Sequence, residues 1–339
     1  TAAFSYDNAL AVIALVACDR RTQALRVGAA LRLAAMSGAR LRNVYRAGAV
    51  GDTTLPNGWW DAKQGRWLED AYQQGTATGN VAWVALAMLS LHDITHDARW
   101  LDAARGLARW CVDNAADPRG AGGFSGGIEG FDASPHQTRW KSSEHNIDLV
   151  ALFGRLAGAV ADAAERERWR AAQSSARHFV DSQWDAPSGH FFIGTTADGS
   201  TPNRATSALD VQLWAQLLPD APAEWRRALA YVAREHAVAG GFDFDADRDG
   251  LWLEGTAQAA LAYRVVGDDA RAQALFATIA GQFSPEGLVY ATREASITTG
   301  LKVSDASKSN DFRYYRRPHI GATAWAAFAA LRANPFASR

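Results

Sequence analysis

The sequence predicts an all-α protein built as an (α/α)6 toroid, in which six inner helices run parallel around one axis inside a layer of outer helices. Helical periodicity dominates the chain, the predicted helices divide into two compositional classes, and the two classes alternate strictly. The inner helices recur at intervals of 46 to 72 residues, which is a loose repeat of helix pairs.

The first class of helix is almost uncharged on every side, and a helix that is apolar all round is buried all round. These inner segments are, in chain order, NALAVIALVAC from Asn8, GNVAWVALAMLSL from Gly79, NIDLVALFGRLAG from Asn146, LDVQLWAQLL from Leu209, GTAQAALAY from Gly255 and GATAWAAFAALR from Gly321.

The second class is amphipathic, with apolar residues at three- and four-residue steps and Arg, Asp and Glu on the opposite face. We expect these helices to form the outer layer, and they begin near Arg20, Asp97, Ala163, Ala221 and Asp268. A sixth outer helix is missing from the pattern after the last inner segment. We therefore expect either an incomplete ring or a helix that precedes Thr1 in a longer precursor.

The connections before the inner helices are long and irregular, at 40–75, 118–143, 186–207, 240–253 and 284–318. Uniform short connections would favour an open α-solenoid, so these loops favour one closed domain over residues 1–339. Loops longer than about 12–15 residues are usually functional. The segments GHFFIGTT and GLVYATRE within them are expected to form short β-hairpins.

Composition excludes several classes of protein. A formal net charge of -1 indicates neither a nucleic-acid-binding surface nor a disordered acidic tail. The apolar runs at 9–18 and 81–91 are near half of the ~20 residues that a bilayer span needs. Cys18 and Cys111 are expected to be free thiols. We expect a secreted or periplasmic bacterial monomer, and leave a cytoplasmic location open because no signal peptide is visible.

Polar residues gather at the starts of the inner helices. Parallel inner helices open their N-termini on one face, so these side chains become neighbours in space. Several are ordinary N-caps, but glutamate is a poor N-cap residue, which singles out Glu144 and Glu254. Asp148 and Gln212 lie about one turn inside apolar helices, where an unpaired polar group costs about 1–3 kcal/mol. These two residues therefore need a partner or a ligand.

The loops bring aromatic and charged residues to the same face, and the chain has 13 tryptophans. Flat aromatic rings suit stacking on sugars, and a mixed-sign surface favours a neutral or mildly charged glycan over nucleic acid. The predicted substrate-binding residues are Trp59, Trp60, Trp67, Trp140, Lys141, His145, Asp148, Gln212, Tyr314, Tyr315, Arg317 and His319.

One acidic stretch, FDFDADRDG at 242–250, partly matches a calcium loop. Asp245, Asp247 and Asp249 follow the D-x-D-x-D-G opening, but the twelfth position is Thr256 and not glutamate. A solvated acidic turn is the alternative interpretation. Apart from this calcium candidate we predict no metal and no cofactor, because nucleotide-binding, zinc-protease and serine-hydrolase motifs are absent from the sequence.

Four segments, FSYDNAL, WKSSEHNIDL, WLEGTAQAALAY and RPHIGATAWAAFAAL, resemble the inner-helix starts of bacterial (α/α)6-barrel carbohydrate-active enzymes. The resemblance extends over nearly the whole chain and implies a glycan cleft at the helix N-termini with acidic catalytic residues. The same fold also carries lyases, sugar epimerases and terpene cyclases, so it does not decide the reaction.

The main hypothesis is that the protein is a glycoside hydrolase. Its resemblance to (α/α)6 hydrolases, most of which are inverting, implies an inverting reaction. One carboxylic acid must protonate the leaving oxygen while a second carboxylate activates water or attacks the sugar. Glu144 is the predicted acid, because an apolar helix start and Trp140 should raise its pKa. The partner is predicted to be Glu254 or Asp7, with Asp70 and Asp210 as further candidates.

Two alternatives remain open. A polysaccharide lyase or sugar epimerase would use His145 or His319 with Tyr314 as base and acid, and Arg317 would neutralise a uronate. A non-catalytic glycan-binding protein would use the same face without turnover. The number of carboxylates exceeds what a neutral sugar needs for binding, which favours an enzyme.

Overall fold

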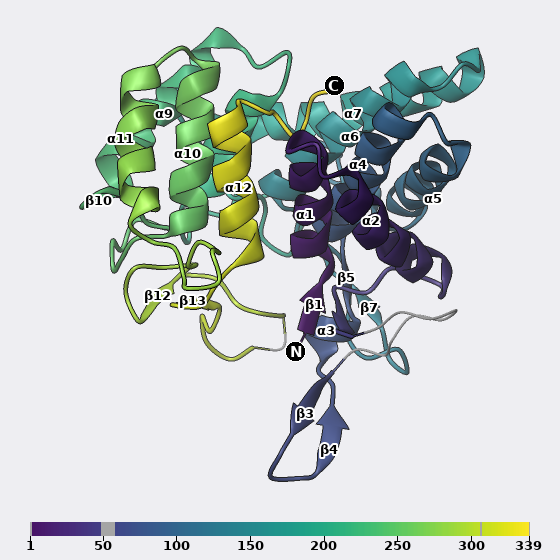
Figure 1. The fold of residues 1–339 in the computed structure, drawn as a ribbon. Coiled ribbons are helices and arrows are strands. Elements are labelled where there is room, and N and C mark those ends of the chain that lie inside the picture. The colour runs from purple at the N-terminus through teal and green to yellow at the C-terminus, as the bar shows by residue number, and fades with distance from the viewer. Residues whose placement is uncertain (1, 49–57, 306, 339) are drawn as a thin grey trace.

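The computed structural model describes residues 2–48, 58–305 and 307–338, and the helices in these ranges form the predicted ring (Figure 1). Each inner helix contacts the next, and the last contacts the first, so the inner ring closes. The inner helices are α1 (Ser5–Ala17), α4 (Thr78–Thr95), α6 (Ser143–Ala159), α8 (Leu209–Trp214), α10 (Leu253–Val265) and α12 (Ile320–Leu331).

The outer helices pack against the inner helices that precede them. Aspartate side chains cap three of these helices by accepting a backbone N–H of the first turn: Asp97 before α5, Asp162 before α7 and Asp268 before α11. In the described part of the chain no outer helix covers α12, as the sequence predicted (Figure 1). The outer helices are α2 (Arg21–Met36), α5 (Ala98–Ala115), α7 (Ala163–Ser182), α9 (Arg227–Glu235) and α11 (Asp269–Ala280).

Helix α8 is shorter than the sequence predicted. The chain changes to the 3-10 turn η1 (Ala215–Leu217), and Leu218 is extended. Pro219 explains this early end, because proline has no N–H and disfavours a helical residue before it. The next outer helix likewise begins with a 3-10 turn, η2 (Ala223–Arg226).

Short antiparallel strands and one short helix, α3 (Ala71–Gln74), occupy the loops. The predicted hairpin at GHFFIGTT is present as β8–β9, whereas 287–294 forms only isolated bridges. Many strands lie at the end of the ring where α1 and α12 begin (Figure 1). The strands are β1 (Ala2–Phe4), β2 (Val44–Arg46), β3 (Trp59–Asp61), β4 (Arg66–Leu68), β5 (Thr76–Ala77), β6 (Gly127–Glu129), β7 (His136–Gln137), β8 (Trp184–Asp185), β9 (His190–Phe191), β10 (Ala237–Val238), β11 (Gly241–Phe242), β12 (Ser296–Thr298) and β13 (Arg313–Tyr315).

A cluster of large aromatic rings fills the ring of inner helices. The Trp83 ring centroid lies 5.3 Å from Trp214, 5.8 Å from Trp325 and 5.3 Å from Phe336. All four side chains are buried, and Phe336 arrives from the segment after α12. The Tyr6 ring packs on Trp83 at 5.6 Å, between this aromatic floor and the helix starts. Several of the tryptophans therefore form the core and are not available to a ligand.

Among the helices that the structure describes, none combines the length and hydropathy that crossing a bilayer requires.

We expect Trp83→Ala to lower the free energy of unfolding by about 3–5 kcal/mol, because it leaves a cavity where three inner helices meet. Trp60→Ala is the matched control: its side chain is 52% exposed, and we expect a change within about 0.5 kcal/mol. Urea unfolding followed by circular dichroism measures both. Equal losses in the two variants would contradict the proposed floor.

Candidate functional site

The second residue of each inner helix defines the mouth of the ring. The sequence placed Glu144 and Glu254 just before their helices, whereas the structure places both inside the first turn. Acidic residues occupy this position on three consecutive inner helices, and two glycines and a tyrosine occupy it on the others. In ring order the six residues are Tyr6, Gly79, Glu144, Asp210, Glu254 and Gly321.

The two glycines leave room for functional side chains. A Cβ on Gly79 would lie 2.5 Å from the His145 ring and 3.2 Å from an Asp148 oxygen. A Cβ on Gly321 would lie 2.5 Å from Oε2 of Glu254. The two distances of 2.5 Å are too short for a non-bonded contact. A residue larger than glycine at either position would therefore displace the side chain of His145 or Glu254.

Glu254 is held from below by a chain of hydrogen bonds. The Tyr6 hydroxyl donates to Oε1 of Glu254 at 2.7 Å and accepts the Trp325 indole N–H at 3.1 Å. The other carboxyl oxygen, Oε2, is buried and has no hydrogen-bond partner within the described ranges. Burial raises the pKa of Glu254 to about 8, and the charges of Asp7 and Asp210 add to this effect. Glu254 is therefore protonated at neutral pH.

His319 borders Glu254, with Nδ1 lying 3.4 Å from Oε2. The same Nδ1 accepts the backbone N–H of Ala322 at 3.1 Å and so caps α12. Because burial lowers the pKa of His319 against the opposing charge of Asp7, the contact with Glu254 involves a neutral imidazole. A neutral ring that accepts at Nδ1 carries its proton on Nε2.

Glu144 and Asp210 have different electrostatic environments. Burial raises the pKa of Glu144 well above its ordinary value, and Asp210 and Glu254 raise it further. Burial raises the pKa of Asp210 only to about 6, because the Val211 N–H donates to its Oδ1 at 2.7 Å. Burial also raises the pKa of Asp7, while His319 opposes the shift. Near pH 7 the mouth therefore holds both protonated and ionised carboxyl groups.

The buried Asp148 and the partly buried His145 add polar groups beside Glu144. Asp148 is fully buried, and neither carboxyl oxygen makes a hydrogen bond of ordinary geometry to any described residue. Burial raises the pKa of Asp148 and lowers that of His145 to about 4, while the nearby Trp83 indole has a smaller, lowering effect on Asp148. The sequence predicted that Asp148 needs a partner, and the protein itself provides no clear hydrogen bond.

Two tyrosines that were not among the predicted catalytic or substrate-binding residues, Tyr6 and Tyr72, complete the mouth. Tyr6 occupies the same helical position as Glu144, which is a signal that an alignment of the six helix starts could have revealed. Burial raises the pKa of Tyr72 to about 12, and the charges of Asp7 and Glu144 contribute. Tyr314, a predicted substrate-binding residue, lies near the same carboxyl groups. Burial raises the pKa of Tyr314, and the charges of Glu254 and Asp210 raise it further.

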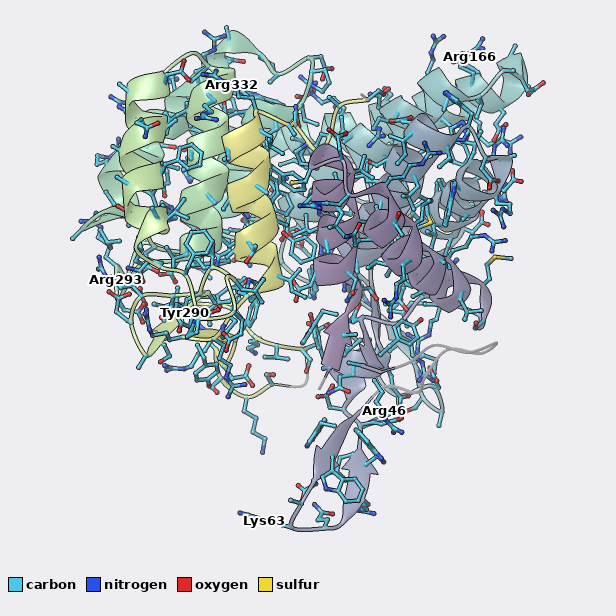
Figure 2. All side chains as sticks on the ribbon, in the orientation of Figure 1. Arg46, Lys63, Arg166, Tyr290, Arg293 and Arg332 are labelled. Atoms are coloured by element: carbon cyan, nitrogen blue, oxygen red, sulfur yellow. The ribbon has the colours of Figure 1, made fainter. Side chains whose placement is uncertain are left out.

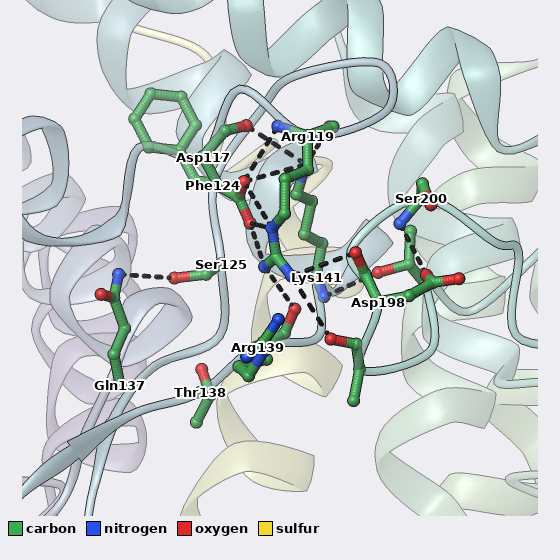
Figure 3. A network of polar contacts seen from close by, with 12 residues as sticks. Asp117, Arg119, Phe124, Ser125, Gln137, Thr138, Arg139, Lys141, Asp198 and Ser200 are labelled. Carbon is green, nitrogen blue, oxygen red and sulfur yellow. Dashed lines mark hydrogen bonds and ion pairs between the residues drawn. The ribbon is translucent and has the colours of Figure 1, made fainter.

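Lys141 has a structural position that contradicts its predicted role in sugar binding. Its buried ammonium group donates to the carbonyl oxygens of Asp117 at 3.2 Å, Arg119 at 2.6 Å and Gly122 at 2.8 Å (Figure 3). Arg119 also forms an ion pair with Asp117 and donates to the carbonyl of Asp198. Lys141 therefore anchors the loop before α6 and has no exposed group for a ligand.

Gln212 and Asp70 also have structural roles. The fully buried amide of Gln212 accepts the Phe191 N–H and donates to the Phe191 carbonyl, both at 2.8 Å, and so joins β9 to α8. This pairing satisfies Gln212 without a ligand. Asp70 accepts the Gln73 N–H at 2.7 Å and caps α3, which satisfies one of its carboxyl oxygens without a ligand.

The predicted aromatic residues divide into two groups. Trp140 borders the mouth, with its ring 5.9 Å from that of His145. Trp59, Trp60 and Trp67 belong instead to the β3–β4 hairpin, which projects away from the ring with Lys63 at its tip (Figures 1 and 2). Arg46 lies over the Trp67 ring at 3.7 Å near the base of the hairpin.

Tyr315 and Arg317, the remaining two predicted substrate-binding residues, lie on the surface. Tyr315 is 52% exposed at the end of β13, and the Arg317 guanidinium lies 5.7 Å from its ring. Both side chains face solvent and are available to a ligand at the rim.

The acidic turn at 242–250 differs from the predicted calcium loop. The carboxyl groups of Asp247 and Asp249 lie within 4.8 Å of Asp243, whereas Asp245 faces Thr206 at 3.3 Å. Burial raises the pKa of Asp243 to about 7, and Asp249 and Asp247 add to the shift. The predicted calcium set of Asp245, Asp247 and Asp249 stays a prediction, and Asp243 is a further candidate beside Asp247 and Asp249. Backbone geometry, and not residue spacing, selects which aspartate joins the group.

No protein-family model and no curated protein matches the chain. Its fold is similar to cellobiose 2-epimerase from Bacillus thermoamylovorans, with a TM-score of 0.66 and 11% identity over 97% of this chain and 88% of that chain. It is also similar to a wild-type glycosidase, with a TM-score of 0.63 and 13% identity over 98% and 88%. The GH76 α-mannanase from Bacteroides thetaiotaomicron gives 0.60 and 12% over 98% and 86%.

These similarities place the chain in the (α/α)6-barrel fold of carbohydrate-active enzymes, as the sequence predicted. The structures that share it include both glycosidases and sugar epimerases. At this level of identity the comparison establishes the fold, and the reaction has to be argued from the side chains at the mouth.

We expect the stability of the protein to fall as pH rises from about 5 to about 8. Glu254 titrates near 8 when folded but near its ordinary 4.5 when unfolded, so between these values the folded state binds more protons. The contribution of Glu254 to stability is then fully present below its pKa in the unfolded state, and it is lost as pH rises through its pKa in the folded state. Urea unfolding across this range should show a shallower decline for Glu254→Gln.

The exposed Glu224→Gln is the control for this measurement and should keep the wild-type slope. If Glu254→Gln declines as steeply as the wild type, the buried Glu254 carboxyl is not the source of the pH dependence.

Proposed function

We propose that the protein is a glycoside hydrolase that binds its glycan across the N-terminal ends of the inner helices. The observation that supports this most directly is the set of acidic side chains on α6, α8 and α10, whose environments separate their pKa values. Titratable neighbours with separated pKa values are the usual basis of acid and base roles in one site.

Glu144 is the proposed general acid. Burial, Asp210 and Glu254 raise its pKa, which favours the protonated form that a group donating a proton to the leaving oxygen needs. It is only partly buried, unlike Glu254, so a substrate can reach it. Asp210 is the proposed second carboxylate, because its pKa of about 6 leaves it ionised. Glu254, protonated and held by Tyr6, would donate a hydrogen bond to a sugar hydroxyl.

The surroundings favour a neutral or mildly charged glycan. Trp140, Tyr72 and Tyr314 supply aromatic faces beside the carboxyl groups, and sugars stack on such faces. Tyr315 and Arg317 lie exposed at the rim. Inversion of the anomeric centre remains the prediction, as it was from the sequence.

Purified protein screened against bacterial and plant polysaccharides should release sugars, with the anomer of the product followed by NMR. On the substrate found, Glu144→Gln and Asp210→Asn should lower kcat/KM by about a thousandfold, because each removes a proton-transfer group. Unchanged thermal unfolding would show that both variants fold.

Glu224→Gln is the matched control for this experiment, because it removes an exposed carboxylate from the outer turn η2. Its activity should stay within a few-fold of the wild type. A folded Glu144→Gln protein with full activity would exclude the proposed acid.

A sugar 2-epimerase is the second candidate, and the two neutral histidines favour it. Burial lowers the pKa of both His145 and His319, so both imidazoles are neutral at neutral pH. His145 would be the base, and His319, whose Nδ1 accepts the Ala322 N–H, would carry on Nε2 the proton that is returned. Epimerisation beside a carbonyl needs one base to remove the C2 proton and a second group to return a proton on the opposite face.

Deuterium distinguishes the two reactions. An epimerase working in D2O would incorporate deuterium at C2 of a reducing sugar, and His145→Asn would abolish the exchange. A hydrolase would release free sugar without C2 exchange and would depend on Glu144. The two outcomes use the same protein preparation and separate the candidates directly.

A further inference from the structure

Three side chains of metal-binding types form a cluster that is separate from the carboxyl groups of the mouth. Glu129 lies in β6, His136 in β7 and Asp305 in the loop between β12 and β13, and their ligand atoms lie within 4.8 Å of one another. Glu129 and His136 are cross-strand partners, so their side chains leave the same face of the hairpin. His136 Nε2 lies 3.9 Å from Glu129 Oε2.

Asp305 connects the β6–β7 hairpin to its own loop, which lies between β12 and β13. Its backbone N–H donates to Oε2 of Glu129 at 2.9 Å, and its carboxylate accepts the indole N–H of Trp140 at 2.9 Å. These contacts join residues 176 and 165 positions apart in the sequence. Glu129 also contributes to the electrostatics of Tyr72, so the cluster borders the mouth.

The residue types of this cluster suit a divalent metal ion. Two carboxylates and one imidazole are a common ligand set for transition metals. At bond lengths of about 2.0–2.2 Å, tetrahedral ligands lie roughly 3.3–3.6 Å apart, so a closing movement of about 1 Å would complete the site.

We propose that Glu129, His136 and Asp305 bind one zinc-like divalent ion, with water as the fourth ligand, and that the ion fastens the β12–β13 loop to the β6–β7 hairpin beside the mouth. The imidazole distinguishes this site from a calcium site, since calcium takes six to eight oxygen ligands. His136 is 53% exposed in its side chain, so an ion can enter and the ring can turn toward it.

Zinc binding to the untagged full chain, after treatment with EDTA, tests the site. Calorimetry and metal analysis should give one zinc per chain, and His136→Ala and Asp305→Ala should each weaken binding at least tenfold. His178→Ala, which removes an exposed histidine from α7, should bind as the wild type does. Absence of zinc binding, or wild-type binding in both His136→Ala and Asp305→Ala, would overturn the proposal.

Limited trypsin digestion tests the fastening of the loop. Lys302 and Lys308 are exposed and flank Asp305, so zinc should slow cleavage after both in the wild type but not in His136→Ala. Cleavage after Lys63, at the tip of the β3–β4 hairpin, is the internal control and should not respond to zinc. If zinc binds at these residues without protecting Lys302 and Lys308, the role as a fastener is overturned.

Discussion

The hydroxyl group of Tyr6 joins three inner helices at the centre of the ring. It accepts the indole N–H of Trp325 in α12 and donates to the carboxyl group of Glu254 in α10, while its own helix, α1, closes the ring against α12. A buried carboxyl group without such a donor would cost several kcal/mol, so this bridge allows Glu254 to lie above a floor of tryptophans. The proposed site depends on that combination, because the apolar floor raises the pKa of Glu254 and the hydrogen bond fixes its orientation.

Parallel inner helices bring equivalent residues of different helices together. Carboxyl groups are favoured at helix N-termini by the helix dipole, and yet burial raises the pKa of Glu144, Asp210 and Glu254. The desolvation effect is larger than the dipole effect at all three positions. Glycines on the flanking helices α4 and α12 supply the space that these groups need. The mouth therefore costs stability, as is common where a protein holds reactive groups in a fixed arrangement.

The loops position this mouth from outside the ring. Lys141 binds three carbonyl oxygens of the 117–122 segment, and Ser142 next to it caps α6, so the first turn that carries Glu144 begins at a rigid point (Figure 3). Gln212 holds β9 against α8 in the same way, close to Asp210. These buried polar groups act on the site through the backbone and not by touching a ligand. Trp140 connects the mouth to the β12–β13 loop, since its ring lies near His145 and its indole N–H donates to Asp305.

The sequence by itself determined the helices, their division into two layers and the gathering of acidic residues at one end, because hydrophobic periodicity and helix starts are local properties of the chain. Only the tertiary structure decided which polar residues face the mouth. Lys141, Gln212 and Asp70 have the residue types of a sugar site, but backbone groups satisfy them. Tyr6 became a site residue through Trp325, which lies 319 positions away. The same holds for the grouping of Asp243 with Asp247 and Asp249 and for the pKa values, because burial and contacts between distant segments arise only when the ring closes.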